Sequence, residues 1–328
     1  MADYKGIKGF KVQSLASDPT LVEGQVWYNT TGNVLKYQAV AAGTWASGGA
    51  LNTSRAFLGT AGTQTAGIVT GGYIDPPATV FGETETYDGS AWTEVADLNT
   101  DRQLSNGAGT QTAALVAAGF LDPGYSALTE EYNGTSWAEV ADLNLARLGS
   151  GGCGTQTAAL NAGGGTQTVG ANTVSEEFNG TSWAEGNNLN TGRQAVIGTG
   201  TQTDALMMGG TPGTMANTES YNGTCWTAQA AFNTARYWAS ASSPPSAGSS
   251  ALLFSGQPPT SGVTNTESYD GSAWTEVNDL ATARWRAGGF GSSTLAVCTG
   301  GSSSPTATMV TTEEWDATAL AVKTVTVS

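Results

Sequence analysis

A repeated unit is the sequence feature that most constrains the fold of this 328-residue chain. Its tryptophans follow one another at intervals of 47, 45, 46, 43 and 48 residues. They are Trp45, Trp92, Trp137, Trp183, Trp226 and Trp274. Ten residues after each of them stands an arginine: Arg55, Arg102, Arg147, Arg193, Arg236 and Arg284. Seven residues before the tryptophan stands a glutamate in five units: Glu85, Glu130, Glu176, Glu219 and Glu267. Glu313 holds the same place before Leu320 in a last unit that has lost its tryptophan. This period indicates stacked copies of one supersecondary unit.

Each unit contains the signals of four β-strands. Apolar runs such as 113–118 and 204–209 are typical of strands that are buried on both faces. Segments such as 84–92 place Asp-Gly or Asn-Gly between two strand-like runs, which is the strongest short-range signal for a tight hairpin. Gly-Thr-Gln-Thr copies predict a further turn before the apolar strand. The period and the four strands together predict blades of a β-propeller.

The units resemble the kelch repeat, in which a strand ends in Gly-Gly and is followed by Tyr-Asp, by Trp and by an arginine before the next strand. The resemblance spans roughly residues 45–316. It implies an all-β fold, a kelch-like β-propeller of four-stranded blades.

The blade count depends on the two ends of the chain. Six kelch-like repeats occupy 55–328, and the sixth would close with the strand 320–328. Four more strands are predicted near the N-terminus, in IKGFKVQ, GQVWYN, VLKYQ and GTWAS. Tyr37 and Trp45 would take the places of the repeat tyrosine and tryptophan there. We therefore expect 1–328 to be one propeller with seven blades in which 1–54 is a divergent N-terminal blade. The alternative is six blades plus an N-terminal hairpin, with 1–54 as an attachment segment.

The repeated charges are predicted to be structural. One glutamate and one arginine per unit indicate an ion pair that anchors the third strand to the chain crossing between blades. The tryptophans at one blade position predict packing between blades. Trp238 and Trp285 lie outside this ladder and are weaker candidates for the core. The three cysteines, Cys153, Cys225 and Cys298, lack metal-binding spacing and are predicted to be small buried residues.

The charge balance excludes several classes of function. The chain has 12 Lys and Arg against 27 Asp and Glu, a formal net charge of −15 and no histidine. A chain this acidic is not expected to bind nucleic acid or anionic lipid, and no segment is apolar enough to predict membrane insertion. Without histidine the commonest general base and zinc ligand are missing, so we expect no enzyme activity, no metal and no cofactor. Only Arg286 lies outside the arginine ladder.

The connections between Gly-Gly and the glutamate vary while their flanks stay fixed. Recognition residues concentrate on loops that a rigid scaffold positions. Two neighbouring loops combine aromatic rings with carboxylates in a way that suits a glycan. The candidate ligand-binding residues on them are Tyr73, Asp75, Phe81, Phe120, Asp122 and Tyr125.

A short N-terminal segment adds a second resemblance. GQVWYNTTGNVLKYQ is similar to a segment of bacteriophage tail-fibre and other virion proteins, and the repeats resemble propellers of marine phages. The resemblance implies a non-enzymatic virion structural protein, a fibre or decoration propeller that binds other virion proteins or a host surface receptor or glycan. The alternatives are a cytoplasmic kelch-type protein-binding adaptor and a lectin-like carbohydrate-binding propeller.

Overall fold

The chain divides into two compact units. The computed structural model describes residues 12–20, 25–40, 42–242, 250–258, 261–318 and 320–325. The larger unit is Thr44–Trp315, and the smaller one combines Met1–Gly43 with Asp316–Ser328. The described regular structure is all β, with no helix that is long and apolar enough to cross a membrane.

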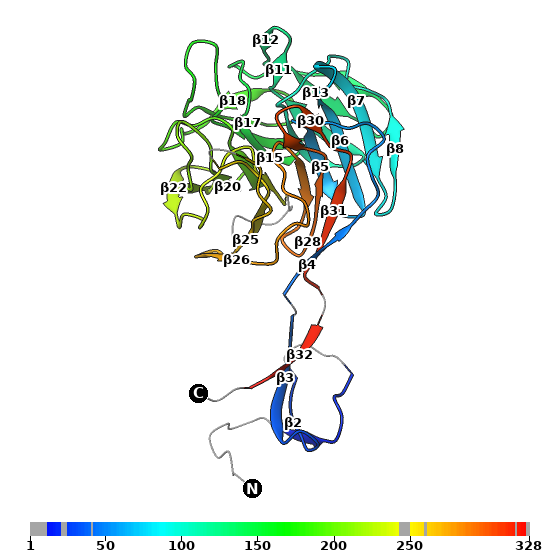
Figure 1. The fold of residues 1–328 in the computed structure, drawn as a ribbon. Coiled ribbons are helices and arrows are strands. Elements are labelled where there is room, and N and C mark those ends of the chain that lie inside the picture. Colours follow the sequence, from blue (N-terminus) through cyan, green and yellow to red (C-terminus); the bar gives the residue numbers. More distant parts are fainter. Residues whose placement is uncertain are drawn as a thin grey trace. The chain divides into compact units, whose positions relative to one another are not determined.

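Six four-stranded sheets build the described part of the larger unit, numbered here sheets 1 to 6 in chain order (Figure 1). Sheet 1 is β5 (Gly59–Thr63), β6 (Ala66–Ile74), β7 (Thr79–Tyr87) and β8 (Trp92–Val95). Sheet 2 is β9 (Asn106–Thr110), β10 (Ala113–Ala117), β13 (Thr129–Tyr132) and β14 (Trp137–Glu139). Sheet 3 is β15 (Gly151–Thr155), β16 (Ala158–Ala162), β17 (Ser175–Phe178) and β18 (Trp183–Glu185). Sheet 4 is β19 (Ile197–Thr201), β20 (Asp204–Met208), β21 (Thr218–Tyr221) and β22 (Trp226–Gln229). Sheet 5 is β23 (Ser240–Ala241), β24 (Ala251–Phe254), β25 (Thr266–Tyr269) and β26 (Trp274–Glu276). Sheet 6 is β27 (Gly288–Gly291), β28 (Leu295–Thr299), β31 (Thr312–Asp316) and β4 (Thr44–Ser47). Two short hairpins, β11 (Phe120–Leu121) with β12 (Gly124–Tyr125) and β29 (Ser302–Ser304) with β30 (Ala307–Thr308), lie in the variable loops.

The last sheet is completed by a strand from early in the chain. The order of sheet 6 is β27-β28-β31-β4, and Figure 1 shows the blue β4 beside the red β31. The predicted closure of this sheet by 320–328 is therefore wrong. Trp45, on β4, supplies the tryptophan that the last repeat was thought to have lost, and its ring lies 5.5 Å from that of Trp315.

The smaller unit is a separate four-stranded sheet of order β1-β2-β3-β32. Its strands are β1 (Gln13–Leu15), β2 (Val26–Asn29), β3 (Val34–Val40) and β32 (Leu320–Thr324). β1 runs parallel to β2, and β32 pairs with β3. The predicted grouping of GQVWYN, VLKYQ and GTWAS into one seventh blade is therefore wrong, because GTWAS contributes β4 to sheet 6. Most of IKGFKVQ lies outside the described residues.

The first strands of the six sheets neighbour one another in a closed order. β5 contacts β9, β9 contacts β15, β15 contacts β19, β19 contacts β23, β23 contacts β27, and β27 contacts β5. Glycine permits this close approach: a Cβ on Gly107 would lie 2.2 Å from the carbonyl oxygen of Thr60, and one on Gly198 would lie 2.8 Å from the amide of Gly152. The glycine-rich composition therefore follows partly from the packing of first strands.

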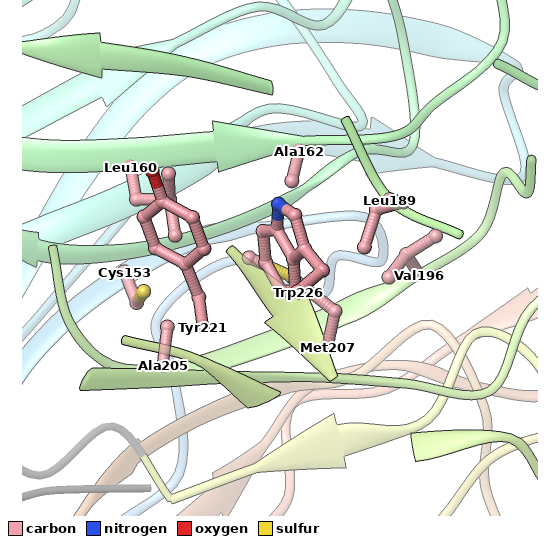
Figure 2. Packing of buried hydrophobic residues seen from close by; sticks show 9 residues of the cluster. All are labelled: Cys153, Leu160, Ala162, Leu189, Val196, Ala205, Met207, Tyr221 and Trp226. Atoms are coloured by element: carbon pink, nitrogen blue, oxygen red, sulfur yellow. The ribbon is translucent and has the colours of Figure 1, made fainter. Parts of the chain in front are cut away.

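The core lies between successive sheets. Figure 2 shows one cluster, in which Cys153 and Leu160 of sheet 3 face Tyr221 and Trp226 of sheet 4. The rings of Tyr221 and Trp226 stack with centroids 4.7 Å apart. Of the cysteines predicted to be buried, Cys153 and Cys298 are, whereas Cys225 is exposed. Cys225 ends the hairpin turn that begins at Asn222, and its side chain is exposed to solvent there.

The predicted ion pair is present in every sheet of the larger unit. Arg55 Nη2 lies 2.5 Å from Glu85 Oε1, and all of the paired side chains are almost fully buried. The other pairs are Arg102–Glu130, Arg147–Glu176, Arg193–Glu219, Arg236–Glu267 and Arg284–Glu313. Each pair ties the third strand to the segment that enters the sheet, as expected from the spacing.

An asparagine that the sequence analysis passed over completes the arrangement in five sheets. Asn144 donates to Oε2 of Glu176 from its backbone amide at 2.7 Å and from its side chain at 2.8 Å. The same side chain donates to the carbonyl oxygen of Trp183 at 3.2 Å. Its counterparts three residues before the arginine are Asn52, Asn99, Asn190 and Asn233. In sheet 6 this place is taken by Ala281, which donates only its backbone amide.

The Gly-Thr-Gln-Thr turns also connect neighbouring sheets. Gln156 Nε2, in the first turn of sheet 3, donates to the carbonyl oxygens of Ala114 at 3.1 Å and Tyr132 at 2.8 Å in sheet 2. Gln64, Gln111 and Gln202 each make the same pair of bonds to the sheet beside their own. The repeated glutamine is therefore a clamp between sheets as well as a turn residue.

Candidate functional site

Six equivalent residues, one per sheet, form a ring that we call the central ring. Each stands two places after the repeat arginine and just before the first strand of its sheet. All six have left-handed backbone angles, with φ between 50° and 62°. The central ring is Phe57, Leu104, Gly149, Ala195, Trp238 and Arg286. Five of the six are not glycine, so the conformation is imposed by the surrounding structure.

Backbone hydrogen bonds hold this ring together. The amide of Leu104 donates to the carbonyl oxygen of Phe57 at 3.0 Å, and that of Phe57 donates to Arg286 at 2.8 Å. Arg286 donates to Trp238 at 2.9 Å, Trp238 to Ala195 at 3.4 Å, and Gly149 to Leu104 at 3.3 Å. Between Gly149 and Ala195, the neighbouring Val196 supplies the amide at 3.1 Å. The bonds run through all six sheets and return to the first.

Five of the six central ring residues, all but Ala195, line a cavity of about 120 Å³, the central cavity, to which every sheet of the larger unit contributes lining residues. The Phe57 and Trp238 rings meet edge to face with centroids 5.0 Å apart. The Arg286 guanidinium carbon lies 4.6 Å from the Phe57 centroid and 5.7 Å from that of Trp285. The Trp238 ring reaches Gly149, where a Cβ would lie 2.7 Å from its Cη2 atom. The cavity therefore has aromatic walls and one cation.

Arg286 differs electrostatically from the six repeat arginines. In the described ranges no carboxylate lies within ion-pair distance of it, and its buried Nε has no hydrogen-bond partner. Burial lowers the pKa of Arg286, and only the hydroxyl groups of Tyr237 and Tyr73 oppose the change. The guanidinium is half-buried without the carboxylate that accompanies every other arginine.

A second hollow, the loop groove, lies between the variable loops of sheets 1 and 2. Its volume is about 800 Å³. Tyr73, Phe120 and Asp122 line it, so the structure brings three of the six candidate ligand-binding residues together. The polar side chains of Asn99 and Asp101, which the sequence analysis did not single out, join them there.

The other three candidate residues have different surroundings. Asp75 accepts a hydrogen bond from the Tyr73 hydroxyl at 3.4 Å. The Phe81 ring lies 5.0 Å from the guanidinium carbon of Arg55 and belongs to the packing around that ion pair. Tyr125 packs edge to face on Phe120, with centroids 6.3 Å apart. Asp75 and Tyr125 therefore contact residues of the groove, whereas the Phe81 ring packs on Arg55.

The loop groove and the central ring lie on connected segments. An isolated bridge pairs Ala56, next to Phe57, with Tyr73, and another pairs Gln103, next to Leu104, with Phe120. Ala56, which bonds to Tyr73, is thus next in sequence to Phe57, which bonds within the central ring. These bridges place the variable loops of sheets 1 and 2 beside the segments that follow Arg55 and Arg102.

The central ring was the part of the site that sequence reasoning missed. Trp238 and Arg286 drew attention only because they fall outside the ladders. Aligning the repeats on the arginine would have placed both in one column with Phe57, and that column is the most variable one near the arginine. Variation at a fixed structural position was the available signal.

Other chemistry is not indicated by the described residues. Within them, no three His, Cys, Asp or Glu side chains are grouped as metal ligands would be. Comparison of the chain with protein-family models gave no match, and a search of curated proteins gave no relative. The functional argument therefore rests on the geometry of this surface.

Proposed function

We propose that this chain is a non-enzymatic recognition protein of a bacteriophage virion, built as a kelch-like β-propeller with six blades. In this proposal sheets 1 to 6 are the blades, and the variable loops with the central ring form the binding face. The partner is a host surface receptor or another virion protein. The smaller unit is the attachment segment.

Three closed sets of contacts support the propeller. The first strands neighbour one another in cyclic order, and the backbone bonds of the central ring follow the same order. A third set links the sheets as well: the second glycine of each Gly-Gly pair or its remnant donates to the carbonyl oxygen of the next arginine, and Gly301 of sheet 6 donates to Arg55 at 2.8 Å. Closed rings of blades leave few free sheet edges.

One observation carries the recognition function. Each of the six repeat arginines is consumed by an internal ion pair, while the variable loops, aromatic rings and the one unpaired arginine gather on a single surface. A scaffold with its repeat arginines satisfied internally and with variable loops on one face is typical of a binding protein. The absence of histidine from the sequence favours binding over catalysis.

Purified virus particles test the proposal. Mass spectrometry should find the chain in particles at a fixed ratio to the capsid protein. The purified protein added in excess should slow adsorption of the virus to host cells. A protein that is abundant in infected cytosol but missing from particles would refute the virion assignment, and it would favour the adaptor.

The loop groove favours glycan as the class of receptor. Tyr73 and Phe120 offer aromatic faces beside the carboxylates of Asp101 and Asp122, a combination suited to pyranose rings and their hydroxyl groups. A Tyr73→Ala, Phe120→Ala double variant should lose binding on a glycan array. Val169→Ser, at an exposed position in the loop of sheet 3, is the matched control and should keep it. Equal binding by both variants would remove the groove from the site.

A further inference from the structure

Arg286 is the one arginine without a counter-ion in the described part of an acidic protein. The other six each contact a buried glutamate. A half-buried guanidinium loses part of its hydration, and only a hydrogen-bonding or charged partner compensates for that free-energy cost. Here its visible partners are the faces of Phe57 and Trp285, which attract a cation but accept no hydrogen bond. The terminal N–H groups are therefore left for a ligand.

The chemistry of the site selects a carboxylate. A guanidinium presents two parallel N–H donors, which match the two oxygens of a carboxylate. The backbone amides of Phe57, Leu104 and their neighbours are occupied by the bonds of the central ring, so they do not supply the extra donors that a dianionic phosphate requires. The site has one cation, Arg286, and the chain has a net charge of −15. The site therefore tolerates one negative charge on a ligand and repels polyanions.

The size and the walls of the cavity place a ligand ring at its mouth. The central cavity has about 120 Å³, which is less than the space of about 150 Å³ that admits benzene. The Phe57 and Trp238 rings meet edge to face and the Trp238 ring reaches Gly149, so these rings offer their apolar surfaces to a ligand ring outside the cavity. A ring that bears a carboxylate and ends a longer chain fits these limits.

We propose that the mouth of the central cavity binds the terminal acidic sugar of a glycan, with its carboxylate on the Arg286 guanidinium and its ring outside the cavity, against Trp238 and Phe57. This inference rests on the proposed function as a recognition protein and adds the chemical class of the ligand. The loop groove, which Tyr73 lines, then holds the neutral sugars that precede the terminal one.

Calorimetric titration of the full chain with D-glucuronate and with D-glucose tests the proposal, because the two sugars share a ring and differ in the carboxylate. Glucuronate should bind roughly tenfold to a hundredfold more tightly, as expected for hydrogen bonds to a charged group. Its affinity should fall as salt is raised. Equal affinity for the two sugars overturns the proposal.

Two variants identify the cation. Arg286→Gln should lose the preference for glucuronate, and Arg286→Lys should keep part of it, because lysine retains the charge without the planar fork. Both should unfold near the wild-type temperature, since Arg286 has no ion pair to lose. Unchanged glucuronate binding in Arg286→Gln overturns the assignment, and tighter binding of a triglycine carboxylate than of glucuronate overturns the sugar.

The same variants separate this inference from the proposed function. If Arg286→Gln protein still competes with virus adsorption and wild-type protein does not bind glucuronate, the inference fails and the recognition function stands. If wild-type protein binds glucuronate but is missing from particles and does not affect adsorption, the virion function fails instead.

Discussion

The buried arginines of this protein fall into two groups with opposite electrostatic surroundings. Arg147, a member of the ladder, donates to Glu176 and to the carbonyl oxygens of Gly163 and Val174. Arg286, in the central ring, lies between aromatic faces with no carboxylate within ion-pair distance among the described residues. The difference shows that arginine count says little about function until the partners are known. Ladder arginines hold the sheets, and the ring arginine is free to act on a ligand.

The largest expected effect comes from removing a ladder arginine. Arg147→Met should lower the free energy of unfolding by about 3 to 5 kcal/mol, because it leaves the buried Glu176 carboxylate without its cation. Denaturant unfolding measures the change. Arg286→Met is the matched control, with an expected loss below about 1 kcal/mol because no carboxylate is left unpaired.

A double replacement sharpens the same contrast. Arg147→Met combined with Glu176→Gln should recover part of the lost stability, because the neutral amide oxygen still accepts from Asn144 and no buried charge is left unpaired. Equal destabilisation by Arg147→Met and Arg286→Met would show that the two groups of arginines do not differ in role.

The second largest effect concerns the asparagine that accompanies five of the ion pairs. Asn144→Ala should cost about 1 to 2 kcal/mol of unfolding free energy, because it removes bonds to Glu176 and to the Trp183 carbonyl. Ala281→Asn should raise stability by about 1 kcal/mol, since it adds the missing donor beside Glu313. A destabilised Ala281→Asn protein would contradict the view that sheet 6 only lacks this bond.

A smaller effect is expected in the central ring. Gly149→Ala should cost about 1 kcal/mol, because it puts a side chain at positive φ and places a Cβ 2.7 Å from Trp238. It should also weaken glucuronate binding several-fold by displacing the Trp238 ring. Gly180→Ala, which also puts a side chain at positive φ but in a hairpin turn outside the central ring, is the control and should leave binding unchanged. Titration calorimetry and denaturant unfolding measure both.

The smallest effect appears at alkaline pH. Burial, together with the hydrogen bond from its hydroxyl to Glu314, raises the pKa of Tyr87 to about 12. In the unfolded chain tyrosine ionises near pH 10, so stability from neutral Tyr87 is complete below about pH 10 and is lost as the pH rises through 12. Stability of Tyr87→Phe should fall less steeply between these values. Parallel curves for the two proteins would contradict this prediction.

Local features of the sequence predicted the sheets and their ion pairs. The Asp-Gly and Asn-Gly turns fix which strands are adjacent, and the constant spacing of Glu85 and Arg55 or Glu130 and Arg102 requires one repeated contact. The assignment of the chain's first and last strands was wrong because pairing of distant strands leaves no local signal. Trp45 precedes Arg55 at the usual interval whether β4 belongs to an N-terminal blade or to sheet 6, so the interval does not distinguish the two.

The site was predicted less completely than the scaffold. Aromatic and acidic residues identified Tyr73, Phe120 and Asp122, which do share a groove. Phe81 was predicted to bind ligand, and its ring lies against the Arg55 guanidinium, a contact that residue type alone does not reveal. The central ring takes one residue from each of six segments that are far apart in the sequence. No single segment therefore contains a pattern that predicts it.

The position of β4 has a consequence for how the protein is made. β4 pairs with β31, and more than 260 residues separate them in the sequence. On the ribosome β4 is the first strand of the larger unit to be synthesised. It has no pairing partner until β31, the last strand of that unit, has been made. Contacts between such distant segments slow folding. The earlier sheets are therefore expected to stack on one another during synthesis, whereas sheet 6 joins the two ends of the unit only after its last strand has left the ribosome.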